Sequence, residues 1–132
     1  MSTRCYIGIK NSDGSVDAIY CHHDGYFSYM GNMLMENYKD ESKVRELIAL
    51  GDCSSVKERL YPTDGSGHSF ETPEDGVTVA YHRDRGEDYA VIHCNSSGEF
   101  WAMSNTEYSD VQHQYLYYPK DSSWMHWYWR NR

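Results

Sequence analysis

The chain has 132 residues, and its 20 Asp and Glu against 12 Lys and Arg give a formal charge of −8 at neutral pH. This length suits one domain. The acidic balance disfavours direct nucleic-acid binding, which needs clustered Lys and Arg to neutralise phosphates. No run approaches the roughly 18 apolar residues of a membrane helix, and no signal-peptide pattern opens the chain. The sequence therefore predicts a soluble cytosolic protein without membrane contacts.

Aromatic residues dominate the apolar content. The chain has 13 Tyr and 4 Trp, while Leu, Ile, Val and Phe together number only 20. Rings and Met are therefore expected to build much of the core. The four Cys lack paired Cys-x-x-Cys spacing, which predicts reduced, partly buried thiols and neither a disulfide framework nor a zinc ribbon.

The first half of the chain predicts a β-hairpin followed by a helical hairpin. Residues 4–10 and 16–22 alternate as strands around Asp13-Gly14, a pair typical of tight turns. The alternation leaves open which face of these strands is the core. Apolar residues at spacings of three and four then predict a helix over about 28–38, and a second helix from Asp40 to a C-cap at Gly51.

The second half predicts a long exposed loop and an antiparallel β-meander. Residues 61–76 are rich in Pro, Gly, Ser, Thr and acids, and strand patterns follow at 76–82, 89–94 and 99–103. Further on, 106–112 reads as a helical turn or a loop, 115–118 as a strand, and 124–129 as an aromatic segment of undetermined period. Residues 1–132 are thus expected to form a single α+β domain.

The densest polar cluster follows the second strand, where His22, His23 and Asp24 precede Tyr26. Two imidazoles and a carboxylate could bind a transition metal or relay protons in a hydrolase. In a continuing strand, however, the two histidines project to opposite sides, and no HExxH or Cys-x-x-Cys motif supplies further ligands. A turn is therefore favoured and no metal or cofactor is expected, while these four residues remain ligand-binding candidates.

A second polar cluster, His82, Arg83 and Arg85, is expected at a hairpin tip between strands 76–82 and 89–94. Guanidinium groups suit phosphate or carboxylate, so a nucleotide pocket could combine Arg83 or Arg85 with a stacking Tyr or Trp. The alternative is that both arginines neutralise the acidic residues beside them on a solvated turn. The second interpretation is favoured.

The C-terminal aromatic segment offers a candidate partner surface: Trp124, Trp127, Tyr128 and Trp129. Trp and Tyr anchor many protein interfaces, so the segment could contact a partner or a second copy. In a chain poor in Leu and Ile it could equally close the core. Both interpretations stay open.

Several segments of the first half form a recognisable set: Met1-Ser2-Thr3-Arg4, Tyr20-x-His22-x-Asp24-Gly25-Tyr26, Gly31…Leu34…Tyr38, and Leu47-Ile48-Ala49-Leu50-Gly51 before Ser54-Ser55. Residues 76–86 add a weaker similarity. Together these segments resemble a family of small uncharacterised proteins encoded in phages and prophages. The family usually has Trp in place of His23 and Pro in place of Phe27, so the loop after the second strand departs from its pattern.

The resemblance implies a phage accessory protein acting in the cytoplasm of the bacterial host, and it brings no catalytic residues with it. The first hypothesis is an acidic inhibitor that binds a basic surface of a host protein or defence complex, of the anti-defence or anti-CRISPR type. A small-molecule or nucleotide-binding sponge is the alternative, and a His- or metal-dependent hydrolase is third. Binding is favoured over catalysis, and the C-terminal aromatic residues leave a homodimer open.

Overall fold

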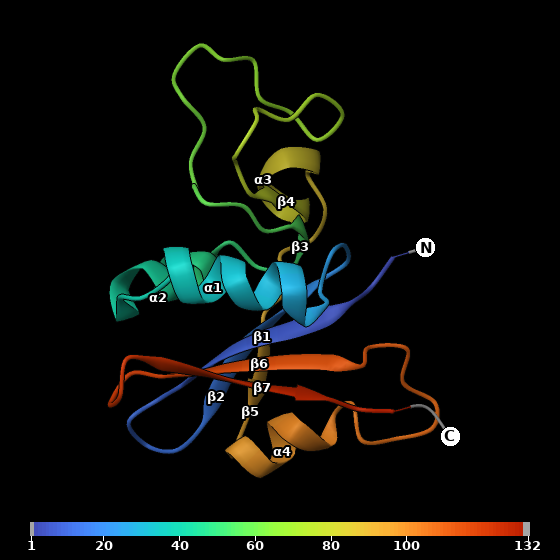
Figure 1. Ribbon diagram of the computed structural model, residues 1–132. Helices are drawn as coiled ribbons and strands as arrows, with labels where there is room; N and C mark the ends of the chain where they lie inside the picture. The colour runs from blue at the N-terminus through green and yellow to red at the C-terminus, as the bar shows by residue number, and fades with distance from the viewer. Residues whose placement is uncertain (1, 131–132) are drawn as a thin grey trace.

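The two N-terminal strands form the predicted hairpin in the middle of a mixed sheet (Figure 1). The computed structural model describes residues 2–130. Strands β1 (Cys5–Lys10) and β2 (Val16–Cys21) pair antiparallel along their whole length. Gly14 in the turn has a φ of 91°, a left-handed conformation that glycine adopts without strain. The turn chemistry seen in the sequence thus sets the hairpin register.

Five further strands complete the sheet: β3 (Cys53–Ser55), β4 (Val79–Ala80), β5 (Ile92–Cys94), β6 (His113–Tyr118) and β7 (Ser123–Tyr128). Their order is β4-β3-β2-β1-β6-β7, and β5 also pairs with β2. The predicted strand at 115–118 is confirmed within β6, which runs parallel to β1. The aromatic segment at 124–129 forms most of the antiparallel edge strand β7.

The predicted strand over residues 76–82 is mostly wrong. Only the two residues of β4 are extended, and helix α3 (Tyr81–Arg85) begins directly after them. The Asp84 carboxylate accepts a hydrogen bond from the Ala80 N–H at 2.8 Å, which satisfies a free donor at the start of the helix. A side-chain contact thus overrides the strand propensity of this segment.

The predicted strand over residues 99–103 is also wrong, because helix α4 (Ser97–Ala102) covers most of this range. The Ser96 hydroxyl oxygen accepts a hydrogen bond from the Glu99 N–H at 3.1 Å. Ser-x-x-Glu is the sequence signature of a capping box, and here it outweighs the strand propensity of the aromatic pair that follows. The fold is therefore α+β with a mixed sheet, and the expected C-terminal meander does not form.

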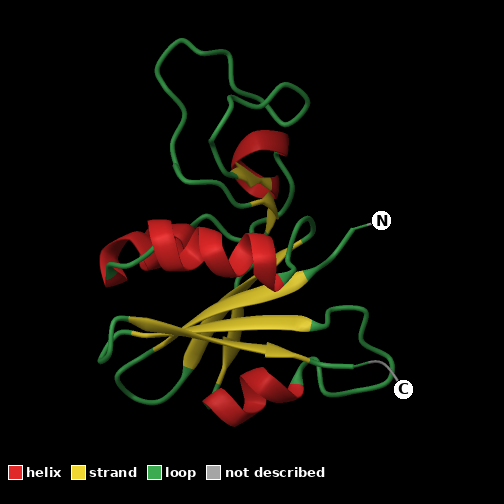
Figure 2. Ribbon diagram, viewed as in Figure 1, coloured by secondary structure: helices red, strands yellow, loops and turns green. Residues whose placement is uncertain are grey.

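Three helical segments cover one face of the sheet (Figure 2). They are η1 (Phe27–Gly31), a π-helical turn, followed by α1 (Asn32–Asn37) and α2 (Glu41–Ala49), so both predicted helices are confirmed. Gly51, with a φ of 80°, follows α2 as expected. The core between helices and sheet is built largely from Ile7, Ile9, Ile19, Met30, Leu34, Tyr38, Val44, Leu47, Tyr115 and Tyr117.

The opposite face of the sheet is also buried, under helix α4. Phe100 is fully buried there with Val16, Ala18 and Leu116. A Cβ atom on Gly8 would lie 3.2 Å from the Phe100 ring, so the missing side chain lets the ring approach the sheet closely. The alternation in the first hairpin therefore marks two core faces. All four cysteines are buried and free, in agreement with the sequence prediction.

Residues 57–88 form a projection that rises from the β3 side of the sheet at the top of Figure 1. As predicted, its long loop at 61–76 contains no helix or strand. A bridge between Arg59 and Val77 closes the base of this loop, and β4 then joins the sheet by pairing with β3. Within the described part of the chain, no helix has the length and apolar character needed to span a membrane.

Candidate functional site

The predicted histidine cluster lies where β2 ends beside β3. The backbone N–H groups of His22 and His23 donate to carbonyl oxygens of the neighbouring β3 strand, so the strand geometry continues briefly. The two imidazole centroids are 4.6 Å apart. His22 Nδ1 lies 2.6 Å from the Tyr20 hydroxyl, while Asp24 takes a left-handed turn conformation at φ 59°. Tyr26, 40% exposed, precedes η1, and its ring lies near that of Tyr29.

The electrostatics of this cluster favour uncharged groups. Burial, with His23 and Arg4 nearby, lowers the pKa of His22, and burial raises the pKa of Tyr20 to about 12. The resulting pair is a neutral imidazole and a neutral phenol at pH 7. Among residues 2–130, no group of three or more His, Cys, Asp or Glu side chains is arranged to hold a metal ion.

His82, Arg83 and Arg85 stand on α3, so their predicted position at a hairpin tip is wrong. Arg83 donates hydrogen bonds to the carbonyl oxygens of Leu60 (2.6 Å) and Thr78 (2.7 Å), and its Nε donates to the Asp84 carboxylate at 2.9 Å. These contacts turn the guanidinium inward and occupy its donors. They support the structural interpretation of Arg83 over a role in phosphate binding.

The other two residues of this cluster also contact the protein itself. Arg85 lies 4.1 Å from the centroid of the Phe70 ring and forms an ion pair with Glu87. His82 Nδ1 lies 2.7 Å from the carbonyl oxygen of Glu87. Arg85 and an aromatic ring, the two groups expected of a nucleotide pocket, thus contact each other, and the Glu87 carboxylate neutralises the Arg85 charge.

A buried polar contact that the sequence does not reveal holds the projection in shape. The side chains of His68 and Asp84 are 3% and 5% exposed, and His68 Nε2 lies 3.2 Å from the Asp84 carboxylate. His68 Nδ1 accepts a hydrogen bond from the Glu74 N–H at 2.9 Å, so the proton of the neutral ring is on Nε2, facing Asp84. Loop and helix are thereby joined across 16 residues, a separation that no local pattern predicts.

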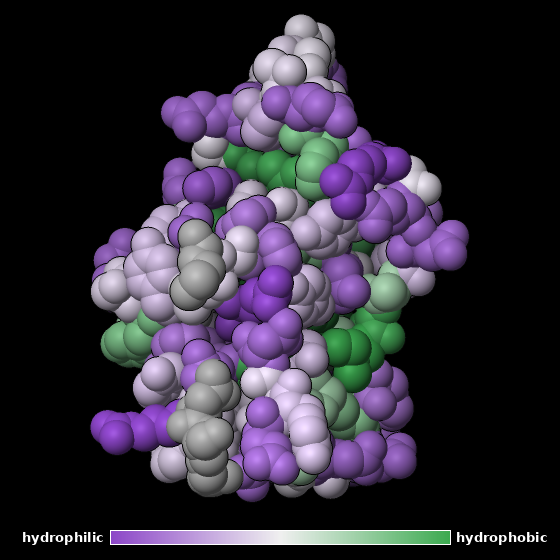
Figure 3. Space-filling model, turned by 90° about the vertical axis from the view of Figure 1, so that its right-hand side faces the viewer, coloured by the Kyte–Doolittle hydropathy of each residue, from purple (hydrophilic) through white to green (hydrophobic). Residues whose placement is uncertain are grey.

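The outer surface of the projection is acidic. Residues 57–88 contain eight acidic and four basic residues, which leaves −4, half of the net charge of the chain. Three of the acids form ion pairs with arginines of the projection. Five others are exposed and make no ion pair among the described residues: Glu58, Asp64, Glu71, Asp75 and Asp88. Figure 3 shows this end of the molecule as mostly hydrophilic, with a small hydrophobic recess below the tip.

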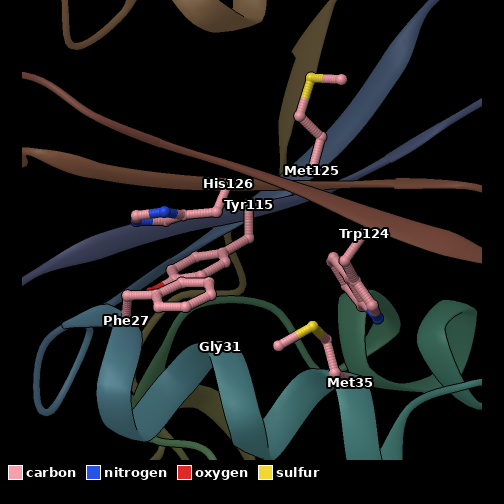
Figure 4. A pocket seen from close by; sticks show the side chains of 7 residues that line it. All are labelled: Phe27, Gly31, Met35, Tyr115, Trp124, Met125 and His126. Carbon is pink, nitrogen blue, oxygen red and sulfur yellow. The ribbon is translucent and has the colours of Figure 1, made fainter.

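An apolar pocket opens between the first helical segment and the edge of the sheet (Figure 4). It has a volume of about 410 Å³ and is lined by Phe27, Gly31 and Met35 on one side and by Tyr115, Trp124, Met125 and His126 on the other. Figure 4 shows Met35 reaching into it from the helix, while Met125 points to the other side of β7. The Phe27 ring folds back over Gly31, where a Cβ atom would lie 2.6 Å from it.

The polar atoms of the pocket walls are largely bonded within the protein. The Tyr115 hydroxyl donates to the Gly25 carbonyl oxygen at 2.7 Å, and the Trp124 indole N–H donates to the Tyr38 carbonyl oxygen at 2.9 Å. The pocket therefore presents ring faces and thioethers, with His126 as its main polar group. Among the described residues, no Lys or Arg side chain lines the pocket.

His126 belongs to a stacked histidine pair. Its Nε2 lies 2.9 Å from His113 Nδ1, and the ring centroids are 5.2 Å apart. Burial and the adjacent His113 lower the pKa of His126 to about 4, and burial lowers the pKa of His113. Both rings are neutral at pH 7. Sequence reasoning missed this pair because its members, 13 residues apart, meet only through the β6–β7 register.

The four C-terminal aromatic candidates divide into two groups. Trp124 contacts the Tyr117 ring, and the Trp129 indole N–H donates to the Gln114 side chain at 2.7 Å, so these two stabilise the edge strand. Trp127 and Tyr128 are 52% and 50% exposed and remain available to a partner. No family model, curated protein or solved structure matches the chain. Its function must be argued from its own contacts and charges.

Proposed function

We propose that the protein is a non-catalytic binding protein that docks its acidic projection, residues 57–88, on a basic surface of a host protein. The observation that carries this proposal is the display of five exposed carboxylates, without ion-pair partners among residues 2–130, on a projection fixed by buried polar contacts. Complementary charge accelerates association and selects partners. The same carboxylates would repel nucleic acid.

The buried polar contacts that fix the shape of the projection support a binding role for its outer surface. Loops of this length without secondary structure are usually either disordered or functional. Burying Asp84 with His68 and Arg83 costs desolvation free energy, and such contacts commonly specify a shape more than they add stability. A loop already fixed in shape loses less conformational entropy when it binds. Its carboxylates therefore meet a partner in a defined arrangement.

The setting of the proposal comes from the resemblance to phage and prophage proteins. In that setting the partner is a protein of the bacterial host, and the binding protein acts in the host cytoplasm as an inhibitor of the anti-defence or anti-CRISPR type. A basic surface that ordinarily holds nucleic acid fits an acidic loop well, because carboxylates can replace phosphates as partners of Lys and Arg.

The test compares two variants that remove equal charge. Asp64→Asn/Glu71→Gln/Asp75→Asn neutralises the projection, and Glu36→Gln/Asp40→Asn/Glu107→Gln neutralises exposed acids elsewhere. Each is used to capture host proteins from lysate, and bound proteins are quantified by mass spectrometry. We expect the projection variant to lose the main partner by about tenfold or more and the control to retain it.

The second part of this experiment varies the salt concentration during capture. Raising salt from about 0.05 to about 0.5 M shortens the screening length severalfold, so capture by the unmodified protein should fall steeply. Equal capture by the two triple variants, or capture insensitive to salt, would contradict docking through the projection.

The aromatic pocket supports a second candidate function, the binding of a planar uncharged ring such as a nucleobase. Its volume suits a small ligand, and its walls include the rings of Phe27 and Tyr115, each of which packs against the His126 imidazole at a centroid distance of 4.7 Å. A phosphate would gain no partner from these walls. Adenosine is therefore a better probe than its 5′-phosphate.

Thermal unfolding tests this second candidate. If adenosine binds with a dissociation constant near 0.1 mM, about 1 mM ligand stabilises the protein by about 1.4 kcal/mol, which raises Tm by a few degrees. Phe27→Ala removes one wall and should abolish the shift, while Tyr108→Ala, at an exposed residue outside the pocket, should keep it. Absence of any shift with adenine, adenosine or its 5′-phosphate would eliminate nucleobase binding in this pocket.

A further inference from the structure

Among the residues that the structure describes, the edge strand β7 has a row of backbone groups without a sheet partner. The Trp129 N–H donates to the Gln112 carbonyl oxygen, next to the register pair His113 and Tyr128. In an antiparallel ladder, alternate residues turn both backbone groups to the same side. The N–H and C=O groups of residues 124, 126 and 128 consequently point away from β6, along the free edge.

This edge lacks the features that normally prevent edge-to-edge pairing. Residues 123–129 contain no charged side chain and no Pro, and the β6–β7 register runs without a bulge. Met125, Trp127 and Tyr128 are 51%, 52% and 50% exposed along it. An uncharged, regular and apolar edge of this kind is suited to receive another strand.

We propose that β7 pairs antiparallel with β7 of a second copy of this chain across a twofold axis at His126. This register places Trp124 opposite the second copy's Tyr128 and Met125 opposite its Trp127. All outward backbone groups of residues 124, 126 and 128 then find partners. An axis at residue 125 would instead require Ser122 to pair with an extended residue of the second copy. Ser122 has a φ of 49°, in the left-handed region, so it cannot continue the strand, and this register is disfavoured.

Charge favours a second copy here and opposes it over most of the remaining surface. With −8 per chain, two copies repel one another in general. At β7, however, Lys120 and Asp121 precede the strand and Arg130 follows it, so the ends of this strand carry no net negative charge. Antiparallel pairing brings each aspartate near the arginine of the other copy, so the ends of the interface are electrostatically complementary.

The helical side of the same edge adds apolar surface to the interface. Phe27 and Met35, 45% and 42% exposed, lie beside β7 at the pocket mouth. Pairing through β7 sets the second copy's Tyr128 next to Trp124 and encloses the open side of the pocket. The dimer is independent of the docking function proposed above, because none of its residues belongs to the projection.

Light scattering after size-exclusion chromatography, with full-length chains at about 1 to 100 μM, tests the proposal. The unmodified protein should be dimeric at the upper concentrations. Met125→Lys and Trp127→Glu should each raise the dimer dissociation constant at least about tenfold, because each buries two unpaired charges per dimer. The double variant should restore the dimer, since each introduced lysine then faces an introduced glutamate of the second copy.

Tyr108→Lys is the matched control, because Tyr108 is 88% exposed on a loop outside β7, and this variant should dimerise as the unmodified protein does. Circular dichroism checks that every variant is folded. A monomeric unmodified protein at about 100 μM, or a dimer unaffected by Met125→Lys, would overturn the proposal. Failure of the folded double variant to restore the dimer would overturn the register centred on His126.

Discussion

Replacing Asp84 by alanine is expected to lower the free energy of unfolding by about 3 kcal/mol, because it leaves the partly buried Arg83, whose side chain is 25% exposed, without its carboxylate. The variant also removes the acceptor for the Ala80 N–H and the carboxylate that lies 3.2 Å from His68 Nε2. Urea unfolding followed by circular dichroism measures the loss. Limited proteolysis should also cut the loop at 61–76 faster than in the unmodified protein.

Asp88→Ala is the control for this experiment. Asp88 belongs to the same projection but is exposed and makes no ion pair within the described chain, so its removal should change the free energy of unfolding by less than about 0.5 kcal/mol. If the two alanine variants were equally stable, the buried carboxylate would not be what holds the projection.

The contribution of Asp84 should also depend on pH. Burial alone would raise the pKa of this carboxyl, but the hydrogen bonds from Arg83, Ala80 and His68 lower the pKa overall. A lowered pKa means that the stabilisation is present above the unfolded-state pKa of about 4 and is lost as pH falls through the folded-state value. The stability difference between the unmodified protein and Asp84→Ala should therefore shrink below about pH 4.

Replacing Phe100 by alanine is expected to lower the free energy of unfolding by about 3 to 5 kcal/mol. Its ring is fully buried between α4 and the sheet and fills the space above Gly8. Val16, Ala18 and Leu116 pack with it and are held in place by the sheet, so the cavity left by the ring can close only partly. Urea unfolding measures the effect, with near-ultraviolet circular dichroism reporting the packing of the neighbouring aromatic rings.

Phe27→Ala is the matched control, since it removes the same ring from a site that is 45% exposed. The Phe27 ring buries less apolar surface than the Phe100 ring, so the decrease in the free energy of unfolding should stay near or below about 1.5 kcal/mol. Similar losses for the two variants would show that α4 does not cover an essential core.

Local patterns were sufficient to predict the first half of the fold. The Asp13-Gly14 turn, the three- and four-residue spacing before Tyr38 and the Gly51 C-cap are each contained within a few residues of sequence. In the second half, the aromatic residues predict strands in two segments that are in fact helical, because side-chain hydrogen bonds at their N-termini stabilise helices there. The Ser96-x-x-Glu99 signature can be recognised in the sequence. The hydrogen bond from the Ala80 N–H to the Asp84 carboxylate, in contrast, is evident only from the folded loop.

The candidate sites were less predictable because their members meet through tertiary structure. The proximity of His22 and His23 follows from adjacency in the chain, but the partners of Arg83 come from residues 60 and 78 and from its neighbour Asp84. The pocket joins residues 27–35 with residues 115–126 through the sheet edge. Such combinations depend on strand order, which periodicity alone does not provide.

The parallel pairing of β1 with β6 has a consequence for biosynthesis. Ile7 lies opposite Tyr115, so the first strand meets its partner only after most of the chain has been synthesised. Until β6 has been synthesised, one side of β1 has no strand partner. The sheet can therefore form completely only after β6 and β7 have left the ribosome, and until then the nascent chain depends on its hairpin and helices to avoid aggregation.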